Sequence, residues 1–230
     1  MDQLSRELAE TALDGAYVQV SELVADLDPA SFLWPSRCAG WAVGDVLYHQ
    51  LLDARRALRT FSSPATGQPD RNDVSYWRPF SADGEIPPGS PAAAEHARHV
   101  RIVASAFSPA ELTWEWTETA GAARRAAKAC PHELVTTQGN ILRTGDFIGT
   151  LAVEAAVHYL DLTVGIPVAP PPDPISLGLV RRVLDGLLGE PRPDGWTDLT
   201  YVLKGTGRLA LTETERTRLG ASAARFPLFG

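Results

Sequence analysis

The chain of 230 residues has only two cysteines, Cys38 and Cys130. Two cysteines so far apart in the sequence form neither a disulfide framework nor the C-x-x-C spacing of a metal-binding thiol pair. The chain also lacks an apolar run of about 18 residues, so no membrane-spanning helix is expected. Its first residues lack the basic and then apolar pattern of a signal peptide. These absences together predict a protein of the reducing cytoplasm that has no contact with the membrane.

The chain carries a net negative charge that is not concentrated in one segment. The formal net charge is −7, from 28 acidic and 21 basic side chains, without a long block of either sign. This pattern argues against a nucleic-acid partner, which would require a basic stripe or patch, and leaves small molecules as the expected ligands. With 44% hydrophobic residues, the chain can bury a substantial core, either as one domain with a small annex or as two domains.

Apolar residues at intervals of three and four predict four helices, over residues 4–27, 43–61, 90–108 and 147–164. The stretch between the second and third helices contains aromatic residues among its prolines and glycines, so it is expected to pack as an ordered loop. Trp114 and Trp116 alternate with polar neighbours and residues 133–137 are strand-like, which predicts one or two short strands before the fourth helix. Four helices with one long connection favour a mainly α bundle.

The C-terminal part of the chain is predicted to form a small α+β annex. Five prolines within residues 167–174 indicate a stiff linker. Beyond it we expect a helix over residues 175–188, strands over residues 199–203 and 208–211, and a short helix capped by Thr212 and Glu215. The predicted domains are therefore a bundle over residues 1–166 and a linker with its annex over residues 167–230.

Three residues on two of the predicted helices carry the clearest chemical signal. Glu154 and His158 are four residues apart and share one helix face. A carboxylate in so apolar a helix is costly to bury without a partner. With His49 from a facing helix, the set would be two histidines and a carboxylate, as in several catalytic zinc centres that keep one position open. On spacing alone, a hydrogen bond between Glu154 and His158 beside a solvated His49 is an equally good interpretation.

Asp161 follows His158 by three residues and is placed to accept the second imidazole proton, although a polar cap of the helix end is an alternative. Cys38 has only Arg37 as a basic neighbour in the sequence, which favours a buried, unreactive thiol. Three further histidines have no partner at ligand spacing and are expected to be solvated: His96, His99 and His132.

Two groups of residues form motifs: Cys38-Ala-Gly-Trp41, Val43, Asp45 and His49 in the first, and Asp146, Glu154, Val157-His158 and Leu160-Asp161-Leu162 in the second. With these motifs, residues 1–166 resemble the mycothiol-dependent maleylpyruvate isomerase family, within the DinB/YfiT-like superfamily of four-helix bundles. The resemblance implies a divalent metal ion such as zinc, bound by His49, Glu154 and His158. It also implies mycothiol or a similar thiol as cosubstrate.

The expected function follows from this resemblance. It implies an enzyme that activates a low-molecular-weight thiol for transfer to, or isomerisation of, a small electrophile, with a metal-bound thiolate or water as nucleophile and none assigned to the protein. Arg208 is a candidate substrate-binding residue, because a guanidinium group binds a carboxylate through two hydrogen bonds. Trp77 is a second candidate, as an aromatic wall of the pocket. The alternatives for them are an exposed arginine and a packed aromatic residue. A metal-assisted hydrolase and a non-catalytic metal-binding or stress-response module need the same ligands and stay open.

Overall fold

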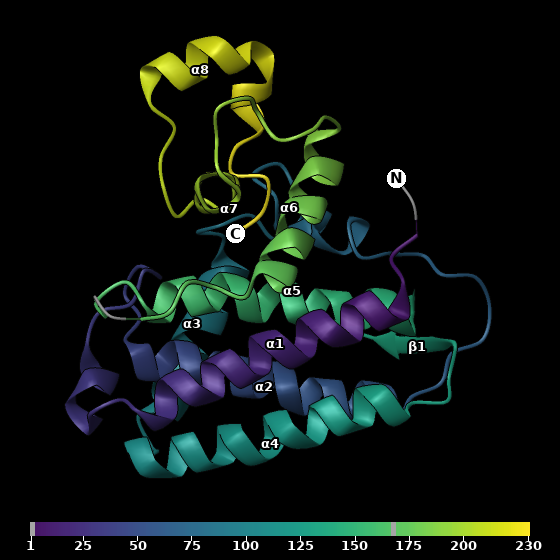
Figure 1. Cartoon of the computed structure of the whole chain (residues 1–230), viewed down its shortest axis with the longest axis vertical. Helices are drawn as coiled ribbons and strands as arrows, with labels where there is room; N and C mark the ends of the chain where they lie inside the picture. Colours follow the sequence, from purple (N-terminus) through teal and green to yellow (C-terminus); the bar gives the residue numbers. More distant parts are fainter. Residues whose placement is uncertain (1–2, 167–168) are drawn as a thin grey trace.

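The computed structural model describes residues 3–166 and 169–230, and four long helices lie side by side in it (Figure 1). They are α1 (Arg6–Ala25), α2 (Val43–Phe61), α4 (Pro109–Ala129) and α5 (Thr144–Leu162). Both α1 and α2 pack against α4 and α5, so the four helices form one bundle. The predicted fold class, a mainly α four-helix bundle, is confirmed.

The connections of the bundle contain short elements. They are η1 (Pro29–Leu33), η2 (Ser75–Phe80), α3 (Pro91–Ala104), β1 (Leu134–Thr137) and β2 (Asn140–Arg143). The strands form an antiparallel hairpin in which Leu134 is opposite Arg143, and β2 leads directly into α5. The strand predicted over residues 133–137 is therefore confirmed, whereas its partner β2 was not predicted.

The strand predicted around Trp114 and Trp116 is wrong, because both residues lie in the helix α4. A capping box starts this helix: Ser108 Oγ accepts from the Glu111 N–H, and the Glu111 carboxylate accepts from the Ser108 N–H. Helical residues two apart point about 200° apart. Trp116 consequently enters the core, while Trp114 is 63% exposed. A short alternation of this kind occurs in an amphipathic helix as well as in a strand.

The annex contains helices and no strand among its described residues. It consists of α6 (Pro174–Leu188), α7 (Asp198–Gly205), α8 (Glu213–Leu219) and η3 (Gly220–Arg225). The strand predicted over residues 199–203 is wrong, because Thr197 Oγ1 caps a helix there by accepting from the Thr200 N–H. The strand predicted over residues 208–211 is also wrong, since this segment has no regular structure. The predicted capping box of Thr212 and Glu215 is present.

The annex is joined to the bundle through α6, which packs against α5 and α1 and rises from α5 in Figure 1. Residues 167 and 168 of the predicted linker lie outside the described residues. Beyond them, the carbonyl of Pro170 accepts a hydrogen bond from the Tyr159 hydroxyl at 2.8 Å. The division into domains at residue 166 stays a prediction. None of the helices in the described part of the chain is long and apolar enough to cross a membrane.

The two tryptophans of α4 provide a test of the bundle packing. Trp116→Ala is expected to lower the free energy of unfolding by about 3–5 kcal/mol, because it leaves a cavity in the core. It also removes the hydrogen bond from Trp116 Nε1 to Ser21 Oγ and the edge contact with Tyr17. The matched control Trp114→Ala is expected to change stability by less than about 0.5 kcal/mol. Denaturant unfolding followed by circular dichroism measures both, and equal losses would contradict this orientation of α4.

Candidate metal centre

His49 of α2 meets Glu154 and His158 of α5 where the two helices face one another. Glu154 Oε1 lies 3.1 Å from His49 Nε2 and 3.6 Å from His158 Nε2. The two imidazole rings are arranged edge to face, with their centroids 4.8 Å apart. One ligand atom from each of the three residues lies within 4.8 Å of the other two. The structure therefore brings together the three residues that the sequence singles out.

The donor atoms of these three side chains fit a divalent metal ion. In a tetrahedral zinc site with bonds of about 2.0–2.1 Å, neighbouring ligand atoms are about 3.3 Å apart. The separations from Glu154 Oε1, 3.1 and 3.6 Å, lie on either side of this value. Imidazole nitrogen and carboxylate oxygen are also donors that zinc accepts readily. A second group of possible ligands, Cys38, His158 and Asp161, shares one histidine with the first.

Glu154 is the point at which α5 can be reached from solvent. Every other residue of this helix is buried, whereas the Glu154 side chain is 21% exposed. Burial alone would raise the pKa of Glu154, but the neighbouring imidazoles of His158 and His49 hold that pKa well below its ordinary value. The two imidazoles thus stabilise the carboxylate that the apolar helix would otherwise exclude.

Asp161 lies behind His158 and has no exposed surface. Its Oδ2 is 2.9 Å from His158 Nδ1 and accepts from the Cys38 thiol at 3.2 Å. Burial would raise the pKa of Asp161, but Arg208 and His158 hold it far below its ordinary value. Burial lowers the pKa of His158, and the bonds to Asp161, Cys38 and Glu154 outweigh that effect and raise it well above the usual range. An acceptor in this place fixes the tautomer and orientation of the ring.

Arg208 makes a two-pronged contact with the carboxylate of Asp161. Arg208 Nε donates to Asp161 Oδ1 at 2.8 Å, and Nη2 donates to Asp161 Oδ2 at 2.7 Å. Its Nη1 donates to the carbonyl of Thr206 at 2.9 Å. The carboxylate that Arg208 binds in this structure is that of Asp161, and its role at a substrate carboxylate stays a prediction. The residue follows the C-terminal end of α7 and is not part of a β-hairpin.

Trp77, the other residue expected at the substrate, is packed into the core. It is 5% exposed, and its ring centroid lies 4.6 Å from that of Phe229 and 5.2 Å from that of Tyr76. These contacts match the packing alternative. Trp41 contacts the candidate centre, with its ring centroid 5.5 Å from that of His49.

His96 is exposed, as predicted, but it also contacts the site, which was not predicted. Its Nε2 lies 3.2 Å from His49 Nδ1, and the two ring centroids are 5.3 Å apart. Burial and the neighbouring His49 lower the pKa of His96. The sequence could not show this contact, because it depends on how α3 packs against α2 and leaves no periodic signal on either helix.

Two further polar residues near His49 were missed. Asp53, one turn along α2, binds Arg56 Nη2 through Oδ1 at 3.0 Å. Its Oδ2 is 3.9 Å from His49 Nε2, and both this oxygen and Arg56 Nε are buried without a hydrogen bond in the described part of the chain. Burial raises the pKa of Asp53 against the opposing effect of Arg56. The spacing His49, Asp53, Arg56 places all three on one helix face and was the available signal.

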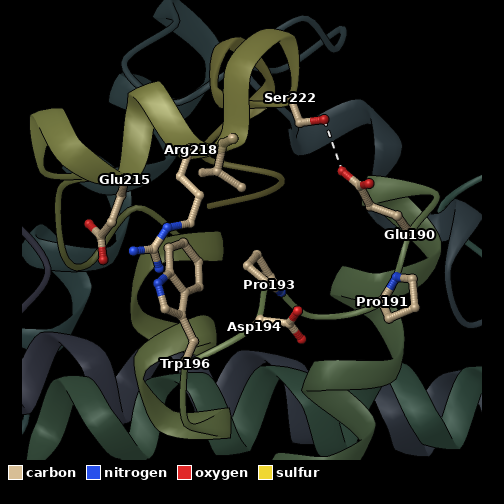
Figure 2. Close-up of a pocket in the computed structure, with 9 residues that line it drawn as sticks. Glu190, Pro191, Pro193, Asp194, Trp196, Glu215, Arg218 and Ser222 are labelled. Carbon is tan, nitrogen blue, oxygen red and sulfur yellow. Dashed lines mark hydrogen bonds between the residues drawn. The ribbon is translucent and has the colours of Figure 1, made fainter.

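A separate cavity of about 270 Å³ lies in the annex, between α8 and the loop that follows α6. Figure 2 shows Glu190 and Ser222 closing one side of it through a hydrogen bond of 2.9 Å. Asp194 and Arg218 contribute further charges to its lining. None of the candidate metal ligands lines this cavity, so it is distinct from the metal centre.

A bundle whose facing helices bring together two histidines and a carboxylate defines a helical protein with a candidate metal centre. The chain belongs to the family of the mycothiol maleylpyruvate isomerase N-terminal domain, whose family model matches residues 13–163. This confirms the resemblance drawn from the sequence motifs. The match includes all three candidate ligands and Asp161, whereas Arg208 lies outside it.

Solved structures of a mycothiol-dependent maleylpyruvate isomerase and of its histidine-to-alanine mutant are similar to this chain. Each gives a TM-score of 0.53 at 17% sequence identity, over 82% of this chain and 72% of the other. At this identity the likeness shows a shared fold. No protein of curated function matches the chain.

Arg208 of the annex is expected to stabilise the folded protein through its buried ion pair with Asp161. Arg208→Met is expected to cost about 3–5 kcal/mol of unfolding free energy at neutral pH, because it leaves a buried carboxylate unpaired. Adding Asp161→Asn should recover part of the loss, and the exposed Arg216→Met is the control.

The folded-state pKa of Asp161 lies below its unfolded value of about 3.9, so the ion pair stabilises the fold above that pH and its contribution is lost as the pH falls. A deficit that does not shrink in acid would contradict this.

Proposed function

We propose that the protein is an enzyme that binds a divalent metal ion, such as zinc, and activates a low-molecular-weight thiol, mycothiol, for transfer to or isomerisation of a small electrophile. His49, Glu154 and His158 would hold the ion. The observation that carries the proposal is the position of Glu154 Oε1, 3.1 and 3.6 Å from the Nε2 atoms of the two histidines. Membership of the isomerase domain family supports the choice of thiol.

A divalent ion held by three protein ligands lowers the pKa of a thiol or water in its open position, so that the nucleophilic form is present at neutral pH. The residues of the chain orient the ligands and receive the bound group. Asp161 holds the ring of His158, and Arg208 holds Asp161. Asp53 Oδ2, 3.9 Å from His49 Nε2, is available to accept a hydrogen bond from a bound group.

The protein itself supplies no nucleophile in this proposal. Cys38 is the thiol close to the site, and its S–H donates to Asp161 Oδ2 at 3.2 Å. In the proposal this thiol serves as a hydrogen-bond donor to Asp161, and the nucleophile is the bound small molecule. The Glu154 side chain is 21% exposed, so the centre is open to solvent at this residue.

Metal content tests the first part of the proposal. Protein purified without chelator is expected to contain one divalent ion per chain, as measured by plasma mass spectrometry. His49→Ala and His158→Ala should each lose most of it, because two protein ligands hold an ion far more weakly than three. His132→Ala is the control, since His132 lies outside the cluster. Full occupancy in both ligand variants would refute the site.

Thiol binding tests the second part. Calorimetric titration of the zinc-loaded protein with mycothiol is expected to show binding that disappears in the zinc-free protein and in Glu154→Gln. Cysteine and other simple thiols, titrated in parallel, measure how much of the affinity comes from the sulfur alone. A zinc-loaded protein that binds no thiol would exclude the thiol chemistry and favour the hydrolase or the non-catalytic module.

A further inference from the structure

The helix α3 is attached to the bundle by few contacts. Of its 14 residues, only Val100 and Ala104 are buried, and both lie in its C-terminal part. It packs against α2, the helix that carries His49. In the N-terminal part of α3, the hydrogen bond between His96 and His49 is a direct contact with the candidate metal centre.

The direction of this hydrogen bond follows from the atom that faces the centre. His49 Nε2 is the nitrogen next to Glu154 Oε1, so it is the one available to a metal ion. A neutral imidazole that uses Nε2 as a ligand has its proton on Nδ1. His49 Nδ1 then donates to His96 Nε2 at 3.2 Å. Trp41 lies against both rings, with centroid distances of 5.5 Å to His49 and 6.4 Å to His96.

We propose that His96 is a positioning residue of the metal centre, which accepts the Nδ1–H of His49 and holds its Nε2 toward Glu154. The inference rests on the proposed function, because it assigns His49 as a metal ligand. The centre then has two matching supports: His158 is held from behind by Asp161, and His49 is held by His96. Partners of this kind fix ring orientation and typically change metal affinity 10–100-fold when they are removed.

The same bond links the metal to α3. A bound ion fixes the proton of His49 on Nδ1 and so strengthens the bond that docks the N-terminal part of α3. Because coupling between two equilibria is reciprocal, docking of α3 raises metal affinity by the same factor by which the metal favours docking. Metal binding is therefore expected to slow amide exchange in α3, although no residue of α3 is a ligand.

Zinc affinity, measured by competition with a chromophoric chelator, tests the inference in three variants. His96→Ala is expected to weaken zinc binding by about tenfold, the lower end of the range, because a neutral acceptor is replaced and not a carboxylate. His96→Gln keeps an acceptor and should recover part of the affinity. His99→Ala is the matched control, since His99 is exposed on the same helix, as His96 is, but among the described contacts it is His96 that is hydrogen-bonded to His49. Unchanged affinity in His96→Ala, with zinc bound to the wild type, would overturn the inference.

Two further measurements separate this role from its alternatives. Hydrogen exchange of residues 91–104 should slow on zinc addition in the wild type and in His99→Ala, and much less in His96→Ala. The cobalt-substituted wild type and His96→Ala should have the same visible absorption bands, because His96 is not a ligand. A changed band pattern would show that His96 binds the metal directly and would overturn the positioning role. A wild type that binds no zinc would instead refute the proposed function.

Discussion

A carboxylate that loses all contact with water must regain its solvation from the protein, and Asp161 does so from three separate segments. His158 of α5 and Cys38 of the loop before α2 bind one of its oxygens, while Arg208 from the annex spans both. Removing one of these donors leaves the buried charge incompletely paired. The orientation of His158, and with it the geometry of the candidate centre, thus depends on residues from the bundle, a loop and the annex at once.

The apolar character of α5 explains why the centre lies where it does. In a helix buried on nearly every side, Glu154 can keep its charge only where other helices offer partners, and α2 offers His49 at 3.1 Å. The side of α2 that carries His49 also carries Asp53 and Arg56, so the interface between the two helices is polar along more than one turn. A buried polar interface with unpaired acceptors and donors is suited to receive a polar ligand.

The sequence predicts three of the four bundle helices, because helical periodicity is a local signal, and α2 has the predicted bounds. The helix predicted over residues 90–108 is α3 in a connection, and the fourth bundle helix, α4, was not predicted. Four residues around Trp114 and Trp116 are too few to separate a strand from a helix, since both place alternate residues on opposite sides. For the site, Glu154 and His158 are linked by spacing alone. The contacts of His96 and of Arg208 are tertiary: each depends on how a distant segment packs, and the sequence could give their chemistry but not their partners.

The family match does not include every residue that shapes the candidate site. The matched region, residues 13–163, contains His49, Glu154, His158 and Asp161, whereas the guanidinium that holds Asp161 comes from Arg208 in the annex. The candidate ligands therefore lie within the matched region, and Asp161, which contacts one of them, is held by a segment outside it. Since the orientation and charge of such partners tune a metal centre, the affinity of the proposed centre would depend on the annex as well as on its three ligands.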